Sequence, residues 1–437
     1  MGDKKLVVIS MDALIYEDLT YLMSKENFGW LINSGAMVER VRSIYPSLTY
    51  PCHITMATGC YPDKHGVINN TANIAGSDNP PWLFDHVHVK QPDILDACKQ
   101  AGLTTAAVGW PVSGNHPAVD YLVNECWPDK GSDAAAFRDI YLRNGTDETL
   151  FNEIVAPVLW MRLGRKQPDS SFFLTQISAE IIRRHKPDVL IMHQGNVDNY
   201  RHKTGVFSPL VTEGLDQCET MLGLIIQATK DAGVFEQTDF VVTADHGHLN
   251  CSRTVHLNTL LVERGFIDVD TDGVVRDWRA YCFPTGMSAL IQLHDPMDKA
   301  LYQSVYDLMQ EVCASGLWGI SKVFTREEVS RRDHLDGDFS FVLETDNASV
   351  FGRHWCGPSS VPSATDLIGA RGGYHGYHPD KGPRPTFLAC GPSFKAGARI
   401  SSANLVDGAP TYAKVLGVSL PNTDGRVLSE LLKEYEL

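Results

Sequence analysis

Short runs of apolar residues, each followed by polar or charged residues, recur along the chain. Four of them have the length and continuous hydrophobicity of strands that are buried on both faces of a parallel sheet. They are residues 6–10, 189–193, 240–243 and 386–389. Helical patterns lie between them, for example at 91–101 and 173–185. This alternation predicts an α/β fold with an open, mostly parallel sheet and helices on both faces.

The stretch 274–370 departs from this alternation. It has a helical pattern at 299–314, a strand pattern at 339–343 and a loop rich in Gly, Pro and Ser at 357–365. The main pattern resumes with the apolar run that begins at residue 386. We therefore expect a core formed by 1–273 and 371–437, and a smaller α+β subdomain inserted over 274–370 as a cap.

Charge and cysteine content exclude some classes of protein. With 53 acidic and 38 basic residues, the formal net charge of −15 argues against binding of a nucleic acid polymer. A small phosphate-bearing substrate remains compatible, because bound cations can reverse the local field. The ten cysteines contain no C-x-x-C pair, which is typical of thiols in a reducing compartment. No apolar run is long enough for a secretory signal or a membrane span, so we expect a cytoplasmic protein.

Acidic residues follow three of the predicted strands. Asp12 comes two residues after the first run, Asp198 follows the second, and Asp245 and His246 follow the third. Ligands of open α/β sheets bind just outside the carboxyl ends of the strands, so these side chains predict one shared site. A single aspartate after a strand is more often a helix cap or turn residue. Three at one edge, with histidines nearby, favour a metal site.

The histidines differ in how well their spacing supports a metal site. Asp198 and His202 are four residues apart, so in a helix both face one side, as a metal requires, although His202 can also be a cap or an exposed residue. The adjacent Asp245 and His246 need a tight loop to turn both inward. His375 lies among glycines, which by themselves indicate only a turn.

Thr49 lies at the predicted start of a helix. Pro51 suits the first helical turn, which places Thr49 or Tyr50 at the helix entrance. Thr49 is then either a simple N-cap or a hydroxyl nucleophile near the positive end of the helix dipole. With no histidine base in a triad order, the second interpretation favours activation by a metal ion.

The blocks carrying these residues occur in an order that resembles a known family. They are P-S-L-T-Y-P-C-H around Thr49, T-G-C-Y-P-x-x-H-G, D-x-x-x-H from Asp198, T-A-D-H-G around Asp245, and G-x-H-G-Y around His375. Their order over nearly the whole chain resembles the nucleotide pyrophosphatase/phosphodiesterase branch of the alkaline phosphatase superfamily. Cys52 stands where that family often has Asn, and the sulfatase motif C-x-P-x-R is missing.

The resemblance implies two divalent metal ions, with zinc favoured and manganese as the alternative. One ion would be held by Asp198, His202 and His375, and the other by Asp12, Asp245, His246 and Thr49. Asn70, twenty-one residues after the nucleophile, would hold a non-bridging phosphate oxygen with help from the backbone N–H of Tyr50. Thr49 would attack phosphorus, and water would then hydrolyse the covalent phosphothreonine.

Candidates for substrate contacts are less distinctive. Besides Tyr50, the aromatic side chains of Trp82 and Tyr200, and also Trp110, are candidates to border the cleft, although a buried core position is the commoner role for such residues. His248 and His378, next to two of the metal-binding blocks, either support the site or lie in solvated loops.

No arginine is marked as a phosphate clamp by its sequence context. Arg353 and Arg371 are candidates on position alone. A monoester dianion usually benefits from such a charge, so its apparent absence favours a diester substrate.

We therefore expect a two-metal phosphodiesterase acting on nucleotides or other small phosphodiesters. A phosphomonoesterase or phosphonate hydrolase with the same metal site is the first alternative, and a phosphate-transferring mutase is another. A non-catalytic, metal-dependent binding protein is disfavoured, because Thr49 and the full ligand set are present. The sequence does not indicate an oligomeric state.

Overall fold

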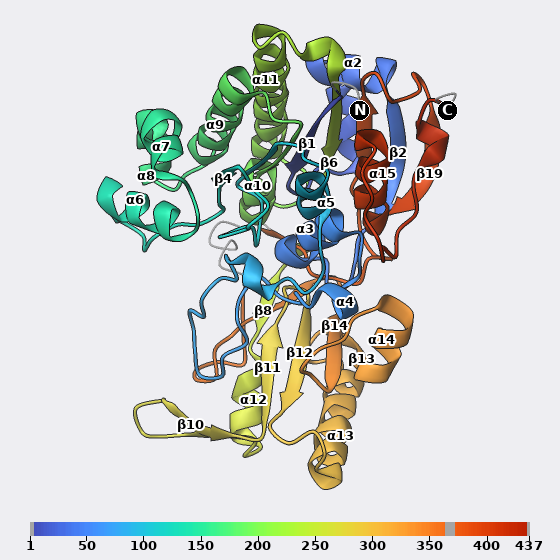
Figure 1. Ribbon diagram of the computed structural model, residues 1–437. Coiled ribbons are helices and arrows are strands. Elements are labelled where there is room, and N and C mark those ends of the chain that lie inside the picture. Colours follow the sequence, from blue (N-terminus) through green and yellow to red (C-terminus); the bar gives the residue numbers. More distant parts are fainter. Residues whose placement is uncertain (1–3, 363–371, 435–437) are drawn as a thin grey trace.

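The structure, a computed structural model, describes residues 4–362 and 372–434. Its centre is an eight-stranded sheet with the order β19-β2-β18-β6-β1-β5-β3-β4 (Figure 1). All neighbouring pairs are parallel except those that β18 makes with β2 and β6. In chain order the strands are β1 (Lys5–Met11), β2 (Ala36–Arg42), β3 (Thr105–Val108), β4 (Tyr121–Val123), β5 (Val189–Gln194), β6 (Thr238–Thr243), β18 (Phe387–Cys390) and β19 (Arg399–Asn404).

Both faces of this sheet are covered by helices, which explains the continuous apolar runs. In β1, Val7 and Ile9 pack into one hydrophobic core, and Leu6 and Val8 pack into another. The first core includes α2 (Glu26–Ser34), α9 (Asp169–His185) and α11 (Pro209–Asp231). The second includes α3 (Thr49–Thr58), α5 (Ile94–Gln100) and α15 (Gly408–Leu416). The open α/β fold predicted from the sequence is confirmed.

One predicted strand runs in the opposite direction. The run at 386–389 forms β18, which is antiparallel to β6 and not parallel as predicted. Phe387, at the start of β18, pairs with Thr243 at the end of β6. The chain therefore enters β18 at the carboxyl end of its neighbour and must run back along it. The apolar run alone carries no information on this direction.

The remaining four strands of the main sheet were not predicted. β3 and β4 have only four and three residues. β2 and β19 mix polar with apolar residues, because β19 is an edge strand and β2 is its neighbour. The predicted helices at 91–101, 173–185 and 299–314 are present as α5, α9 and α13 (Lys299–Ser315).

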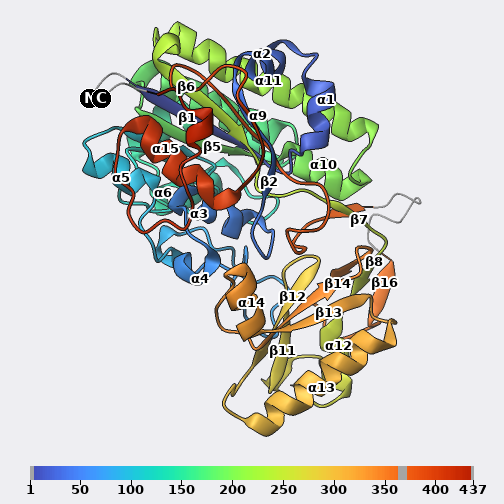
Figure 2. The same ribbon diagram turned by 90° about the vertical axis from the view of Figure 1, so that its right-hand side faces the viewer.

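A second, smaller sheet lies below the main one in Figure 1. Figure 2 shows the two as separate lobes that meet near β7 (Leu249–Cys251) and β8 (Arg253–Val255). It is antiparallel, in the order β11-β12-β14-β13. The strands are β11 (Ala280–Pro284), β12 (Ser288–Leu293), β13 (Ile320–Thr325) and β14 (Phe341–Thr345). β14 overlaps the strand pattern seen at 339–343.

The hydrophobic core of the small lobe extends beyond 274–370. It includes α13, but also Leu257 and Leu261 of α12 (Leu257–Glu263) and the distant Tyr45. β16 (Ser360–Pro362) lies within the predicted loop 357–365 and pairs with β8 (Arg253–Val255). The boundaries at 273/274 and 370/371 stay a prediction.

All ten cysteines are free thiols, and eight of them are buried. Over residues 4–362 and 372–434, we find no helix with both the length and the hydrophobicity needed to cross a bilayer. The cytoplasmic location expected from the sequence stays a prediction.

Candidate active site

Three neighbouring strands deliver acidic residues to one edge of the main sheet. β1 lies between β5 and β6, so Asp12 after β1 lies close to the residues that follow β6. Nε2 of His246 is 3.2 Å from Oδ2 of Asp245 and 3.6 Å from Oδ1 of Asp12. The same nitrogen is 3.3 Å from Oγ1 of Thr49. The four side chains predicted to share one metal ion therefore converge on a single point.

Thr49 is the first residue of α3, and Leu48 occupies the N-cap position. No side chain caps this helix, so the Thr49 hydroxyl does not serve as the cap that the sequence left open. The helix fixes the side chain beside His246, in a largely buried position with 9% of the residue exposed. Its hydroxyl is therefore positioned for chemistry at the carboxylate cluster.

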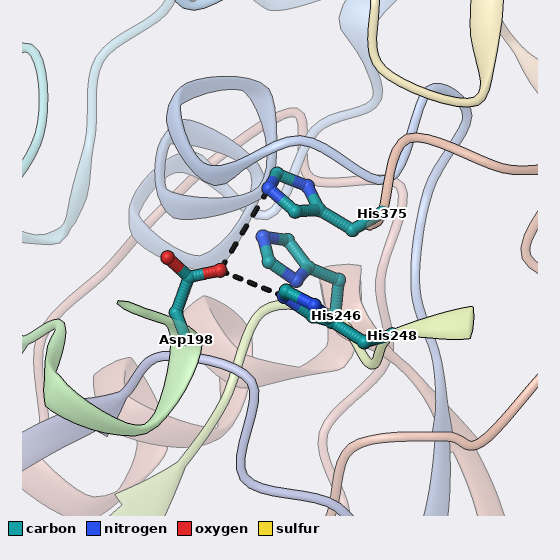
Figure 3. A group of neighbouring side chains, drawn as sticks. All are labelled: Asp198, His246, His248 and His375. Atoms are coloured by element: carbon teal, nitrogen blue, oxygen red, sulfur yellow. Dashed lines mark hydrogen bonds and ion pairs between the residues drawn. The ribbon is translucent and has the colours of Figure 1, made fainter. Parts of the chain in front are cut away.

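The second cluster is centred on Oδ1 of Asp198. Nε2 of His248, His202 and His375 lie 2.7, 3.3 and 3.8 Å from this oxygen. Asp198 and His202 belong to α10 (Asn196–Thr204), and the helix places both on one side as their spacing predicted. Figure 3 shows the carboxylate of Asp198 facing the rings of His248 and His375, with His246 between the two rings.

His375 reaches the cluster through a short strand pairing. β17 (Gly372–Tyr374) pairs with β7 (Leu249–Cys251), which follows the loop that carries His246 and His248. Gly373 is required at this crossing, since a Cβ atom there would lie 2.8 Å from the carbonyl oxygen of Arg201 and 2.9 Å from Nδ1 of His248. The glycines around His375 thus permit the close packing.

Two histidines have their tautomers fixed by backbone carbonyls. Nδ1 of His202 donates to the oxygen of Gly373 at 2.8 Å, and Nδ1 of His375 donates to the oxygen of Ser47 at 3.0 Å. Burial lowers the pKa of His375 to about 4, so its ring is neutral at pH 7. Its Nε2 lone pair then points toward the Asp198 carboxylate, an arrangement that a cation between them would stabilise.

The carboxylates of the first cluster also fit a cation. Oδ1 of Asp12 and Oδ2 of Asp245 are buried and have no hydrogen-bond partner in the described part of the chain. Burial and the charge of Asp198 raise the pKa of Asp12 well above its usual range, and the same two causes raise that of Asp245 to about 7. Two buried carboxylates with the half-buried Asp198 nearby favour a bound divalent cation, which would remove the repulsion. Both clusters therefore fit metal ions.

Two further histidines hold this geometry and were not identified from the sequence. Nε2 of His193, at the end of β5, is 3.1 Å from Oδ2 of Asp12, which leaves Oδ1 directed at the cluster. His53 donates from Nδ1 to the carbonyl oxygen of Thr49 at 2.7 Å and accepts from Ser10 at 2.8 Å. It thereby ties the start of α3 to β1. A polar residue such as His193 at the end of an otherwise apolar strand was the available signal.

Asn70 lies beside the predicted nucleophile. The backbone N–H of Tyr50 donates to Oδ1 of Asn70 at 2.9 Å. Since an N–H can only donate, this bond fixes the amide so that Nδ2 of Asn70 is free to donate elsewhere. The Tyr50 N–H, expected from the resemblance to contact phosphate, is instead bonded to Asn70 in this structure.

A cavity of about 260 Å³ opens beside Thr49 and Asp198. Tyr50 and Trp82 line it as predicted, and Trp127, which the sequence did not single out, joins them. The ring centroids of Tyr50 and Trp82 are 5.3 Å apart, and those of Trp82 and Trp127 are 5.1 Å apart. These aromatic side chains form one wall suited to an organic group.

Two of the proposed aromatic contacts lie elsewhere. Tyr200 packs against α11 and donates its hydroxyl to Gln217 at 3.1 Å, so the structure does not bring it to the cavity. Trp110 is buried against the ring of His53 at a centroid distance of 4.8 Å. The helix α10 directs the side chains of Asp198 and Tyr200 to different sides. The D-x-x-x-H pattern that starts at Asp198 does not by itself indicate this difference.

The arginines in the cavity are also different from those considered in the sequence. Arg162 and Arg165 line it, whereas Arg353 donates to Thr71 at 2.9 Å. Arg371 lies outside the described residues. Neither Arg162 nor Arg165 belongs to a recognisable motif, so the sequence offered no signal for them.

Two other groups that contain histidines are explained by local structure. His378 pairs with Asp333 at 2.9 Å, away from both clusters. A separate group contains His86, Asp93, Asp96 and His116. There, Asp93 and Asp96 form the capping box of α5, and His116 is 3.1 Å from Asp93.

Comparisons with known proteins extend these observations. The sequence matches the family model of type I phosphodiesterase / nucleotide pyrophosphatase over residues 6–373. Ectonucleotide pyrophosphatase/phosphodiesterase family member 3 of Rattus norvegicus is 23% identical over 407 residues, covering 89% of this chain and 39% of the rat protein. The bis(5′-adenosyl)-triphosphatase of Xenopus laevis is 23% identical over 424 residues, covering 95% of this chain and 78% of the frog protein. The chain thus spans less than half of the rat relative.

Solved structures show the same fold. Mouse ectonucleotide pyrophosphatase/phosphodiesterase 5 aligns with a TM-score of 0.66 and 19% identity, over 98% of this chain and 100% of the mouse chain. An inactive threonine-to-alanine variant of that mouse protein, in complex with AMP, aligns with a TM-score of 0.67 at 19% identity, with the same coverage.

Proposed function

Since the chain belongs to the type I phosphodiesterase / nucleotide pyrophosphatase family, whose model matches residues 6–373, we propose that it hydrolyses small organic phosphodiesters, including nucleotides. The observation that carries the proposal is the convergence of Thr49, Asp12 and Asp245 on Nε2 of His246. A lone hydroxyl among buried carboxylates is the arrangement expected for a nucleophile beside a metal ion.

Thr49 is the proposed nucleophile. Its Oγ1 attacks phosphorus, the bond to the leaving alcohol breaks, and an esterified phosphothreonine forms. Water then cleaves the bond between phosphorus and Oγ1 and regenerates the hydroxyl. The inactive threonine-to-alanine variant among the solved relatives supports a role for a threonine in this family.

Two divalent cations, zinc in the first instance and manganese as the alternative, fit the two clusters. Asp12, Asp245, His246 and Thr49 would hold one, and Asp198, His202 and His375 the other, with His248 able to join them at 2.7 Å from Asp198. When bound, such cations supply positive charge that lowers the pKa of a hydroxyl and stabilises a departing oxygen.

The remaining side chains act on the substrate. Nδ2 of Asn70, left free by the bond from Tyr50, is proposed to donate to a non-bridging phosphate oxygen. The rings of Tyr50, Trp82 and Trp127 offer an apolar wall for the second ester group. Stacking of a nucleobase on such rings is worth about 1–3 kcal/mol per base.

A phosphomonoesterase is the second candidate. Arg162 and Arg165 line the cavity that also contains Thr49, and arginines at this position favour substrates with additional negative charge. A phosphodiester carries one negative charge, whereas a monoester dianion carries two and would gain more from two arginines.

Hydrolysis of bis-p-nitrophenyl phosphate beside p-nitrophenyl phosphate tests the proposal. Purified protein is treated with chelator and then supplied with zinc or manganese. Metal-dependent turnover that favours the diester supports a phosphodiesterase. Preference for the monoester moves the assignment to a phosphatase, and turnover of neither ester contradicts both candidates.

A further inference from the structure

Two arginines extend the cavity away from the metal-binding clusters. Arg162 belongs to α8 (Trp160–Leu163), and Arg165 follows in the next turn with a φ of 48°. Their guanidinium carbons lie 5.9 and 5.2 Å from the ring centroid of Trp127. Both side chains line the same cavity as Thr49 and Asp198. The positive charges and the aromatic wall therefore face one space.

These guanidinium groups have few partners of their own. Nη1 of Arg165 donates to the carbonyl oxygen of Pro128 at 3.1 Å. Nε of Arg162 is buried and has no hydrogen-bond partner among the residues that the structure describes. Within those same residues, neither arginine has a carboxylate oxygen at 4.0 Å or closer. Unpaired donors of this kind, at a half-buried and an exposed arginine, are ready to bind an anion.

The carboxyl groups of the cavity do not supply that anion. Asp12 and Asp198 belong to the clusters that fit cations. Glu125 also lines the cavity, but neither of its carboxyl oxygens lies within 4.0 Å of the Arg162 or Arg165 guanidinium group. The charge on Arg162 and Arg165 is thus available to a ligand.

We propose that Arg162 and Arg165 form a second anion-binding site within the substrate cavity. Substrates would carry, besides the reacting phosphodiester, a further phosphate or carboxylate on the organic group that packs against Trp127. The proposal rests on the proposed function for the reacting phosphate and adds the substrate class. Arginine recognises both anions through paired N–H donors, so the two groups share one chemistry.

Equilibrium binding separates this inference from catalysis. Metal-loaded protein carrying Thr49→Ala is titrated calorimetrically with AMP, ADP, adenosine 3′,5′-bisphosphate and adenylosuccinate, so that turnover does not interfere. Compared with AMP, ADP and adenosine 3′,5′-bisphosphate each carry one additional phosphate, at different positions, and adenylosuccinate carries two carboxylates. Arg162→Gln and Arg165→Gln are compared with Lys166→Gln, a matched loss of charge from an exposed neighbour that does not line the cavity.

We expect at least one of the ligands that carry a second anionic group to bind about tenfold or more tightly than AMP. Arg162→Gln and Arg165→Gln should each abolish that gain, and Lys166→Gln should retain it. The ligand with the higher affinity than AMP shows whether phosphate or carboxylate is the second anion. Absence of any gain over AMP, or a gain that survives both arginine substitutions, overturns the proposal.

An equal loss of affinity for AMP and for every other ligand also overturns it. The arginines would then contact the phosphate at Thr49, as in the monoesterase candidate. Binding is measured without turnover, so it tests this proposal separately from the proposed function. Failure of the enzyme to hydrolyse bis-p-nitrophenyl phosphate would refute the proposed function but would not change the interpretation of the binding data.

Discussion

Nε2 of His246 lies 3.3 Å from Oγ1 of Thr49, although 197 residues separate the two along the chain. His246 follows β6, which pairs with β1. Residues of β1 and of α3, the helix that begins with Thr49, pack into the same hydrophobic core. These two packings bring the two side chains together. Asp12 and Asp245 approach the same nitrogen. The nucleophile and its surroundings thus depend on the pairing of two central strands.

Replacing Thr49 removes the attacking oxygen. We expect Thr49→Ala to lower kcat for bis-p-nitrophenyl phosphate on the order of 10³-fold or more, while both metal equivalents are retained. Thr49→Ser keeps a hydroxyl and should retain measurable turnover. Comparable steady-state rates for wild type and Thr49→Ala would remove Thr49 from the reaction.

Replacing His375 removes one imidazole from the Asp198 cluster. His375→Ala should lose one of two metal equivalents by elemental analysis, because its Nε2 faces Oδ1 of Asp198 at 3.8 Å. His378→Ala is the control, since that histidine pairs with Asp333 outside both clusters. Full metal occupancy in His375→Ala would contradict its assignment as a ligand.

Asn70→Asp separates the two functions of the Asn70 amide. The carboxylate still accepts from the N–H of Tyr50, but the Nδ2 donor is lost. We expect kcat to fall about 10²- to 10³-fold with little change in Tm. A variant with wild-type kcat would show that this donor does not contact the transition state.

Glu125 predicts a pH-dependent stability in chelator. Burial raises its pKa from 4.5 to about 8, so between these values the folded protein holds a proton that the unfolded chain has released. Its contribution to stability therefore falls as pH rises from about 5 to 8. Glu125→Gln lacks this titration, so the Tm of wild type minus that of the variant should decrease over this range. A difference independent of pH would show that Glu125 does not titrate there.

Arg201 lies in α10, the helix that carries Asp198, and forms a buried ion pair. It is fully buried, and its Nη2 lies 2.5 Å from Oδ2 of Asp18. Arg201→Met leaves a buried carboxylate unpaired and should cost about 3–5 kcal/mol in urea unfolding. The double variant with Asp18→Asn should lose less, because no charge remains buried. Equal losses in the single and double variants would exclude the ion pair as the cause.

The sequence alone determined the features that depend on local order. An apolar run specified β1, β5 and β6, and the carboxylates after them were predicted to meet because parallel strands end at one edge. The four-residue spacing of Asp198 and His202 required only that one helix form. These features hold because each follows from residues close together in the chain.

Only the tertiary structure decided which residues meet across the cavity. The direction of β18 depends on where the chain enters it, and an apolar run is the same in either direction. Tyr200 packs inward against α11, whereas Arg162 and Arg165 line the cavity that also contains Thr49. The cavity brings Thr49 together with arginines more than a hundred residues away in the chain, so its lining follows from tertiary packing and not from any local pattern.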